Sequence, residues 1–452
     1  MTKLTLPRDR ALLGIIGLAA LLGLAYNAVV LLGYGPDEPR HLNYVKLLFE
    51  EHVFPRLNPD GSEYHGAHSY HPPLYYFALL PFYAALHALP EGVMWHGLRL
   101  VSLLLCLASL PLIYQIGLRA GGGDRALACL IVAQVGLLPI FGMTCGIINN
   151  DSGLLLAVTV FLWLLAVKYP DDTSWKSALM LGVCFGLGTL CKGTALFCDF
   201  AALAAYLWAQ NGVKGLRAAR PWLRLGLTLG TAIAIAAPWY ARNHALYGVW
   251  QPIPLGFAPA DMGWLPKATY GPVLQMFHPN FPPLLGQAAW GIFYSMWSQK
   301  DWIPDPLRLS LYLFFAAYCV LALVGTARRK WRRQSSEAAV PDRAERIAVW
   351  SGSAAFVITY FACLQNALFV HWGQHEGGRY LIPVFSGLSI FLARGWRGLV
   401  GAQRIPILTA CWCASTFGSV RSRTGWTTTP SRMWSAPRVV ATSDSALTVS
   451  SA

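Results

Sequence analysis

The sequence predicts an all-α polytopic membrane protein with about ten transmembrane helices, and three observations support this fold class. Of the 452 residues, 55% are hydrophobic and only 12% are charged, which is about half the charged fraction of an average soluble domain. The mean hydropathy is +0.44. Long apolar runs recur along most of the chain, as expected for helices that cross a lipid bilayer. These features exclude a soluble enzyme.

The first predicted span is residues 11–32, an uninterrupted apolar run that follows Lys3, Arg8 and Arg10. It is longer than the apolar core of a signal peptide, and no small-residue cleavage site follows it, so we expect a retained helix with a cytoplasmic N-terminus. The further candidate spans are residues 97–118, 127–147, 152–167, 178–191, 195–210, 223–240, 307–327, 347–365 and 380–393.

Two other apolar segments, residues 73–89 and 281–297, are predicted to lie in the membrane interface. The first contains Pro81 and many aromatic residues, and counting it as a span would reverse the side of every later loop. With it left out, Lys and Arg collect in one set of connections, which the positive-inside rule makes cytoplasmic. The basic connections lie around residues 119–125, 168–176, 214–224, 328–346 and 394–404.

The same topology gives two large outer segments, at about residues 33–96 and 241–306, and places all eleven histidines on the outer face. The net charge of +14 then reflects the cytoplasmic connections, and no nucleic-acid partner is predicted. The ten cysteines contain no CxxC pair and indicate neither a disulfide framework nor a cysteine zinc site. We therefore expect any chemistry to occur on the outer side.

Residues 1–410 are predicted to form one transmembrane domain. After an apolar start at Ile405, the composition changes to Ser, Thr, Arg and Trp without periodicity. Residues 411–452 are therefore interpreted as a disordered or aberrant C-terminal tail, such as a truncated or frame-shifted reading frame would produce.

Carboxylates at the outer membrane edge are the first candidate catalytic groups. Asp37 and Glu38 follow the first span, and Asp151 lies in the short Asn149-Asn150-Asp151 connection. Each is also a residue type that favours the start of a helix, so a helix cap is the alternative for Asp37 and for Asp151. As functional groups, two outer acids beside one cavity would activate an acceptor hydroxyl as general bases.

Histidines in the first outer segment could hold a divalent metal ion. The spacing His65-x-x-His68-x-x-His71 offers nitrogen ligands, and His41 lies one helical turn after Asp37. The metal candidates are His41, His65 and His68. The alternative is that these are hydrogen-bonded surface histidines, and no cofactor is required by the sequence.

Isolated cations on the outer side could bind a phosphate. They are Lys192, Arg242 and Arg379, which stand apart from the basic cytoplasmic connections. Arginine offers two aligned donors to a phosphate and lysine a point charge. The alternative for each is an extended side chain that reaches lipid headgroups.

Six short motifs give the sequence a family resemblance. They are PDEPRH (36–41), SYHPPLYYF (69–77), NND (149–151), CKGTAL (191–196), PWYARNHALYG (238–248) and GGRYLIP (377–383). In this order they resemble the GT-C membrane glycosyltransferases, in particular the lipid A aminoarabinose transferases and protein O-mannosyltransferases. The likeness covers about residues 10–395.

The resemblance implies an enzyme that moves a sugar from a polyprenyl-phosphate donor to a lipid, glycan or protein acceptor, with inversion at the anomeric carbon. It implies that Asp37 is the general base, with Glu38 beside it, and that Asp151 is the second outer acid. His71 takes the place of a basic residue before the paired prolines that contacts phosphate. The implied location is a bacterial inner membrane, with the active site facing the periplasm or the outside.

A polytopic transporter or lipid flippase is the alternative function. Such a protein is expected to show repeated halves and charges at midplane depth. Here no internal repeat is visible, and the carboxylates gather in outer loops. The sequence therefore favours the transferase and leaves its sugar and acceptor open.

Overall fold

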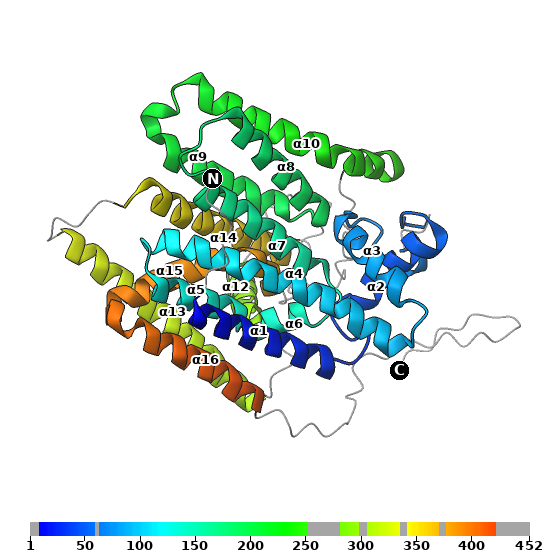
Figure 1. Cartoon of the computed structure of the whole chain (residues 1–452), viewed down its shortest axis with the longest axis horizontal. Helices are drawn as coiled ribbons and strands as arrows, with labels where there is room; N and C mark the ends of the chain where they lie inside the picture. The colour runs from blue at the N-terminus through cyan, green and yellow to red at the C-terminus, as the bar shows by residue number, and fades with distance from the viewer. Residues whose placement is uncertain are drawn as a thin grey trace, which may run out of the picture.

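The computed structural model describes residues 9–58, 63–248, 250, 281–297, 305–334, 341–369 and 377–421. Each predicted apolar run is helical over most of its length, and helices make up nearly all of the described chain (Figure 1). The helices are α1 (Arg10–Val29), α2 (Glu38–Lys46), α3 (Leu74–Leu86), α4 (Glu91–Ala120), α5 (Arg125–Gly136), α6 (Pro139–Cys145), α7 (Asn150–Trp163), α8 (Trp175–Cys191), α9 (Ala195–Gly215), α10 (Ala219–Tyr247), α12 (Phe281–Trp297), α13 (Asp305–Gln334), α14 (Arg343–Phe369), α15 (Phe385–Val400) and α16 (Ile405–Arg421). The shorter elements are η1 (Leu47–Glu51), η2 (Tyr64–Gly66), η3 (Leu164–Lys168), η5 (Gly377–Val384) and η6 (Ala402–Arg404).

Five segments are long and apolar enough to cross a membrane. They are α1, α4, α7 continued by η3, and parts of α13 and α14. Helices α5 and α6 add a sixth if they count as one span, bent by 64° before Pro139. The predicted number of about ten is larger because α8, α9, α10 and α15 are shorter or less apolar. The chain is an all-α multi-pass membrane protein, as predicted.

Side-chain caps set several helix starts. Asp9 accepts hydrogen bonds from the backbone N–H groups at the start of α1, and Asp124 does so for α5. Asn149 caps α7 and Ser174 caps α8 in the same way. The cap of α7 is therefore Asn149, and the alternative role of Asp151 as that cap is wrong.

Glycines allow neighbouring helices to approach closely. Helix α8 packs along α10, and α13 packs along α15. A Cβ atom added at Gly182 in α8 would lie 2.5 Å from the Thr228 carbonyl oxygen of α10, and one added at Gly395 in α15 would overlap the Ala322 carbonyl of α13. Small residues at helix crossings are typical of membrane bundles, in which packing rather than water exclusion drives association.

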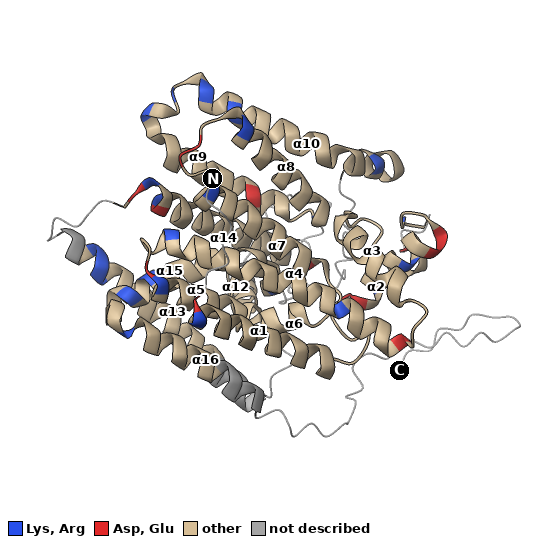
Figure 2. Cartoon of the chain, in the orientation of Figure 1, with Lys and Arg blue, Asp and Glu red and all other residues tan. Residues whose placement is uncertain are grey.

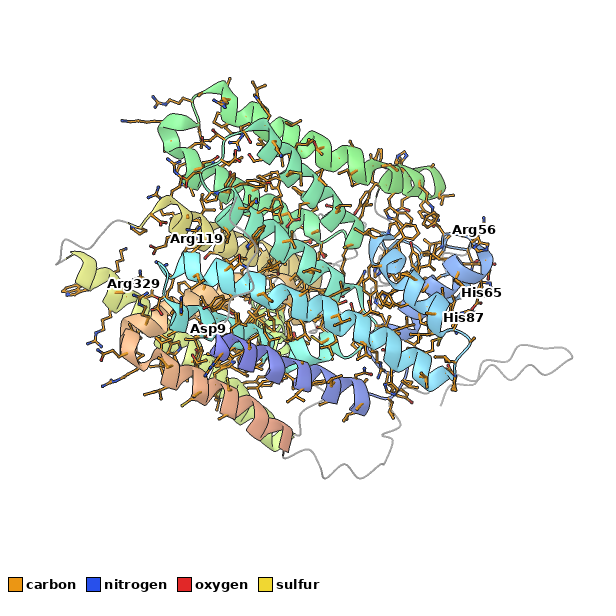
Figure 3. The ribbon with its side chains drawn as sticks, viewed as in Figure 1. Asp9, Arg56, His65, His87, Arg119 and Arg329 are labelled. Atoms are coloured by element: carbon orange, nitrogen blue, oxygen red, sulfur yellow. The ribbon has the colours of Figure 1, made fainter. Side chains whose placement is uncertain are left out.

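The two ends of the bundle differ. Helices α2 and α3 lie together at one end of the bundle, beside the start of α4 (Figure 1). Most Lys and Arg residues lie at the opposite end (Figure 2). Figure 3 places Arg119 and Arg329 at this basic end and Arg56, His65 and His87 at the end with α2 and α3.

Two sequence interpretations fall partly outside the described chain, and a third meets a helix. The second outer segment is described only at residues 241–248, 250, 281–297 and 305–306. The predicted domain boundary at residue 410 falls inside α16, which continues to Arg421. Residues 422–452 of the predicted tail lie outside the described residues.

Candidate active site

The carboxylate of Asp37 lies at the end of the bundle that carries α2 and α3, where it pairs with an arginine from far along the chain. Nη2 of Arg379 donates a hydrogen bond of 2.8 Å to Oδ2 of Asp37. Arg40 lies further away, with its Nη1 atom 3.8 Å from Oδ1. Asp37 occupies the N-cap position of α2 and Glu38 its first turn, as the alternative of a helix start expected, but the Asp37 side chain makes no capping hydrogen bond and is directed to Arg379 instead.

The electrostatic surroundings keep Asp37 ionised. Burial acts to raise the pKa of this carboxyl, but the charge of Arg379 and the hydrogen bond from it outweigh burial and lower the pKa to about 2. The residue also has a φ of 60°, in the left-handed region that is uncommon for residues other than glycine. Such backbone strain is typical of functional sites.

A second acid–cation pair forms between the start of α7 and the residue after α8. Nζ of Lys192 lies 2.5 Å from Oδ1 of Asp151, and both side chains are buried, with 12% and 3% of their surface exposed. The backbone N–H of Asp151 donates to the Asn149 side chain, which fixes the first turn of α7. Lys192 therefore pairs with an acid inside the protein and does not extend toward lipid headgroups.

Tyr380 joins the two pairs. Nζ of Lys192 lies 5.0 Å from the centre of its ring, and the Arg379 guanidinium lies at the same distance. Arg379 also donates a hydrogen bond of 3.1 Å to the Tyr380 hydroxyl. The structure thus brings the predicted residues Asp37, Asp151, Lys192 and Arg379 into one cluster, which we call the acid–cation cluster.

The backbone around Arg379 is held against α12. The N–H of Gly378 donates a hydrogen bond of 2.9 Å to Oγ of Ser295. A Cβ atom at Gly378 would overlap the backbone of Ser295 and Met296. A glycine is therefore needed at this position for η5 to lie on α12 and to direct Arg379 toward Asp37.

Glu38 forms a buried ion pair with Arg99, whereas a catalytic role was predicted for it. Its side chain is fully buried, and both of its oxygens accept hydrogen bonds of 2.7 Å from Arg99 of α4. The backbone N–H groups of Gly35 and Ile148 donate to the same carboxylate. Because these bonds occupy both oxygens, we correct the assignment of Glu38 to a positioning residue for Asp37.

Arg99 also binds the end of the first membrane helix. Its remaining N–H groups donate to the backbone carbonyls of Asn27, Val30 and Leu31. The Glu38–Arg99 pair therefore joins α1, α4 and the residue that follows Asp37. Sequence reasoning missed Arg99, although a lone arginine near the start of an apolar run is itself a signal of a functional or structural pair.

His71 lies beside the acid–cation cluster and is tied to two neighbours. Its Nδ1 atom is 3.1 Å from the Tyr76 hydroxyl and 3.2 Å from the side-chain nitrogen of Asn150. Burial, together with the nearby charge of Lys192, lowers the pKa of His71 well below its usual value. His71 is therefore a neutral hydrogen-bonding group rather than a cation.

The predicted metal candidates separate into two places. His41 and His68 lie with His71. Each of the three rings offers one nitrogen, and these three nitrogens all lie within 4.8 Å of one another. His65 lies apart and exposed, with Nε2 3.9 Å from Glu51. The grouping of His65 with His41 and His68 is therefore wrong, because the backbone directs the His65 side chain toward Glu51.

Arg242 lies in α10 and contacts aromatic residues and backbone. Its Nη2 donates a hydrogen bond of 2.8 Å to the Pro55 carbonyl, and its guanidinium lies 4.7 Å from the Trp239 ring and 5.6 Å from the Phe54 ring. These contacts connect α10 to the first outer segment. Within the described chain, the hydrogen bonds and ring contacts of Arg242 do not include the acid–cation cluster, with which it was predicted to bind phosphate.

Comparison with known proteins gives one family match. Residues 70–241, less than half of the chain, match the family described as dolichyl-phosphate-mannose-protein mannosyltransferase. This segment contains His71, Asp151 and Lys192 but neither Asp37 nor Arg379. A search of curated protein sequences found no match.

Solved structures with a similar fold include several membrane glycosyltransferases. The oligosaccharyltransferase of Archaeoglobus fulgidus is 13% identical, with a TM-score of 0.52 over 93% of this chain and 54% of that one. This chain therefore spans about half the length of the archaeal enzyme, and the likeness concerns the fold. ArnT from Cupriavidus metallidurans is 15% identical, with a TM-score of 0.39 over 86% of this chain and 77% of that one.

The family match and the shared fold point to the same class of protein. Both agree with the multi-pass helical architecture and with the family resemblance of the motifs. Residues 70–241 are thus similar to a glycosyltransferase family, and the fold of the chain is similar to that of an archaeal oligosaccharyltransferase.

Proposed function

We propose that the protein transfers a sugar from a polyprenyl-phosphate donor to the hydroxyl of a lipid, glycan or protein acceptor, with Asp37 as the general base. The acid–cation cluster carries this proposal, because it combines an ionised carboxylate with two cations in one place. The family that matches residues 70–241 is named for a dolichyl-phosphate sugar donor, which supports a polyprenyl phosphate as the leaving group.

The reaction needs a base and cations but no strong acid. The acceptor oxygen attacks the anomeric carbon and its proton passes to Asp37, while the bond from that carbon to the phosphate oxygen breaks. The electron pair of this bond leaves with the polyprenyl phosphate, and the configuration at the anomeric carbon inverts. A phosphate is a good leaving group without protonation, so the developing negative charge requires cations instead.

Lys192 and Arg379 are the proposed cations for that charge. Both are largely buried, and buried charge-assisted hydrogen bonds to phosphate are stronger than those in water. His71, which lies beside them, is proposed to face the same phosphate. Asp151 is proposed to orient Lys192.

The proposed active site faces the extracytoplasmic side of the membrane. Most Lys and Arg residues lie at the end of the bundle away from α2 and α3 (Figure 2), and such residues favour the cytoplasmic side. Labelling of a cysteine introduced at exposed Tyr34 in intact cells tests this orientation. Failure to label it from outside would reverse the proposed side.

Transfer is tested with the purified full chain in lipid vesicles and a panel of synthetic polyprenyl-phosphate sugars. Mass spectrometry should detect free polyprenyl phosphate only when a suitable acceptor is present. We expect Asp37→Asn to lower the rate by about 10²- to 10⁴-fold, the usual contribution of a general base. Glu51→Gln, an exposed acid in the same outer segment, should leave it unchanged.

Two results would contradict the proposal. One is an Asp37→Asn protein that keeps its rate while remaining folded. The other is a cell envelope whose glycolipids and glycoproteins have the same masses with and without the gene.

A further inference from the structure

Three histidine rings from two segments of the chain meet in the interior of the first outer segment. His41 is on α2, while His68 and His71 precede α3. The ring centres of His68 and His71 are 4.1 Å apart, those of His41 and His68 4.8 Å, and those of His41 and His71 5.7 Å. His41 and His68 are almost completely buried, at 2% and 3% exposure. Surface histidines do not have this arrangement.

The hydrogen bonds of the rings hold one nitrogen of each and leave the other available. Nδ1 of His68 lies 3.1 Å from Oε1 of Glu63. Nδ1 of His41 and Nδ1 of His71 lie 2.9 and 3.1 Å from the same Tyr76 hydroxyl oxygen, which can accept a hydrogen bond from each. Nδ1 of His71 also lies 3.2 Å from Nδ2 of Asn150, whose Oδ1 has no partner within the described residues; turning this amide by 180° places Oδ1 there as an acceptor for the Nδ1 proton. A ring that donates through Nδ1 presents a lone pair at Nε2.

One of these Nε2 atoms lacks the partner that a buried polar atom requires. Nε2 of His68 is buried and has no hydrogen-bond partner within the described residues. Buried polar atoms without a partner are rare, and each calls for a ligand, an ion or a water molecule. The unpartnered atom belongs to the central histidine of the three.

We propose that His41, His68 and His71 bind one divalent transition-metal ion through their Nε2 atoms, with Zn²⁺ as the ion that fits best. Neutral imidazole is a preferred ligand of Zn²⁺. The Glu63–His68 hydrogen bond supplies the carboxylate–histidine contact that orients metal-binding histidines. The candidate nitrogens already lie within 4.8 Å of one another, and small side-chain rotations bring them to the N–N separation of about 3.4 Å that Zn–N bonds of about 2.1 Å require.

The number of ligands indicates what such an ion does. Three histidines are the full set of His, Cys, Asp and Glu ligands found at this place in the described chain. Three protein ligands leave an exchangeable position, whereas structural zinc sites have four. The ion therefore keeps a water or accepts a phosphate oxygen there, and it fastens the segment before α3 to α2. Metal binding by this group does not depend on the proposed sugar transfer.

Cobalt substitution tests the site without any activity assay. The detergent-purified full chain is freed of metal with a chelator and titrated with Co²⁺. We expect one Co²⁺ per chain and visible absorption of the intensity characteristic of four-coordinate cobalt, which Zn²⁺ then displaces. His68→Gln should lower the affinity by at least 100-fold, and His65→Gln, which changes an exposed histidine outside the group, should leave the titration unchanged.

Folding is followed separately, so that a loss of metal is not mistaken for a loss of structure. Size-exclusion chromatography and the helical circular dichroism of His68→Gln and His41→Gln should match those of the unchanged protein. A titration without stoichiometric cobalt absorption would overturn the proposal, and so would a His68→Gln protein that binds as the unchanged one does. If both substituted proteins misfold, the melting temperature is measured instead. Zn²⁺ should then raise it equally in the unchanged protein and in His65→Gln. If Zn²⁺ raises it in neither protein, the proposal is overturned.

Discussion

Arg379 donates a hydrogen bond to Asp37 although 342 positions separate the two residues in the chain. The pairing keeps the proposed base ionised, but it also makes this carboxylate a weak base, with a pKa of about 2. A donor phosphate that draws the Arg379 guanidinium toward itself would weaken its hold on Asp37 and let the pKa of Asp37 rise. The binding of the donor and the basicity of Asp37 are therefore linked through one arginine.

Removal of Arg379 should change the pH dependence of the reaction. In the unchanged protein Asp37 is ionised above a pH of about 2, so acidification to about pH 4 does not protonate it. In Arg379→Gln the burial that raises the pKa is no longer opposed by this charge, and the acid limb of kcat/KM should move to higher pH.

The profile is measured between about pH 4 and 9, the range in which a general base with a raised pKa is protonated. Arg40→Gln is the matched control, because Arg40 is more exposed and further from Asp37, at 3.8 Å. Arg40→Gln should shift the acid limb of kcat/KM less than Arg379→Gln does. Superimposable acid limbs for Arg379→Gln and the unchanged protein would show that the pair does not set the basicity.

Loss of Lys192 should weaken donor binding. A charged hydrogen bond to phosphate contributes about 1.5–3 kcal/mol, so Lys192→Gln should raise the Kd for polyprenyl phosphate by about 10- to 100-fold. Lys176→Gln at the other end of α8 is the control and should bind normally. Equal Kd values for the two proteins in a binding titration would remove Lys192 from the phosphate site.

Breaking the Glu38–Arg99 pair should cost far more stability than breaking an exposed ion pair. Arg99→Met leaves a buried carboxylate without its partner, and we expect the free energy of unfolding to fall by about 3–5 kcal/mol. The exposed pair of Arg343 with Asp171 is the comparison, and Arg343→Met should cost about 0–1 kcal/mol. Thermal denaturation in detergent measures both, and similar losses would mean that Arg99 is not a structural centre.

Two adjacent glycines should tolerate alanine differently. At Gly377 an added Cβ meets Ile292 and Cys363 at ordinary distances of 3.5 and 3.8 Å, so Gly377→Ala should keep its activity. At Gly378 it would overlap the backbone of α12 and displace Arg379. Gly378→Ala should therefore lose most of its transfer rate, and a rate equal to that of Gly377→Ala would contradict the proposed packing.

Helical segments were predictable because each lies in an apolar run, but the number of membrane spans was not, because several of these helices are too short or too polar to cross on their own. The two segments predicted to lie in the interface are helical: 281–297 coincides with α12, and 73–89 contains α3. Boundaries were less predictable where the helix type changes: the last predicted span begins at residue 380, whereas α15 begins at Phe385 after η5. Local hydropathy does not distinguish a 3-10 turn from the α-helix that follows it.

The acid–cation cluster was predictable as a set of residue types but not as pairs. Asp37 and Glu38 are adjacent and chemically alike, and only the position of Arg99 on α4 makes one of them structural. Tyr380, which contacts both cations, gave no signal beyond its place after Arg379. Likewise, the regular spacing of His65, His68 and His71 suggested one group, but a turn of the backbone directs the first away.

The Glu38–Arg99 pair also determines what moves together with the proposed base. Arg99 holds three carbonyls at the end of α1, and Glu38 directly follows Asp37. A shift of the first membrane helix along its axis is therefore transmitted to the carboxylate without passing through the rest of the outer segment. If Asp37 is the base, as proposed, we expect lipid acyl-chain length, which changes how deeply such a helix sits, to alter the turnover rate from within the bilayer.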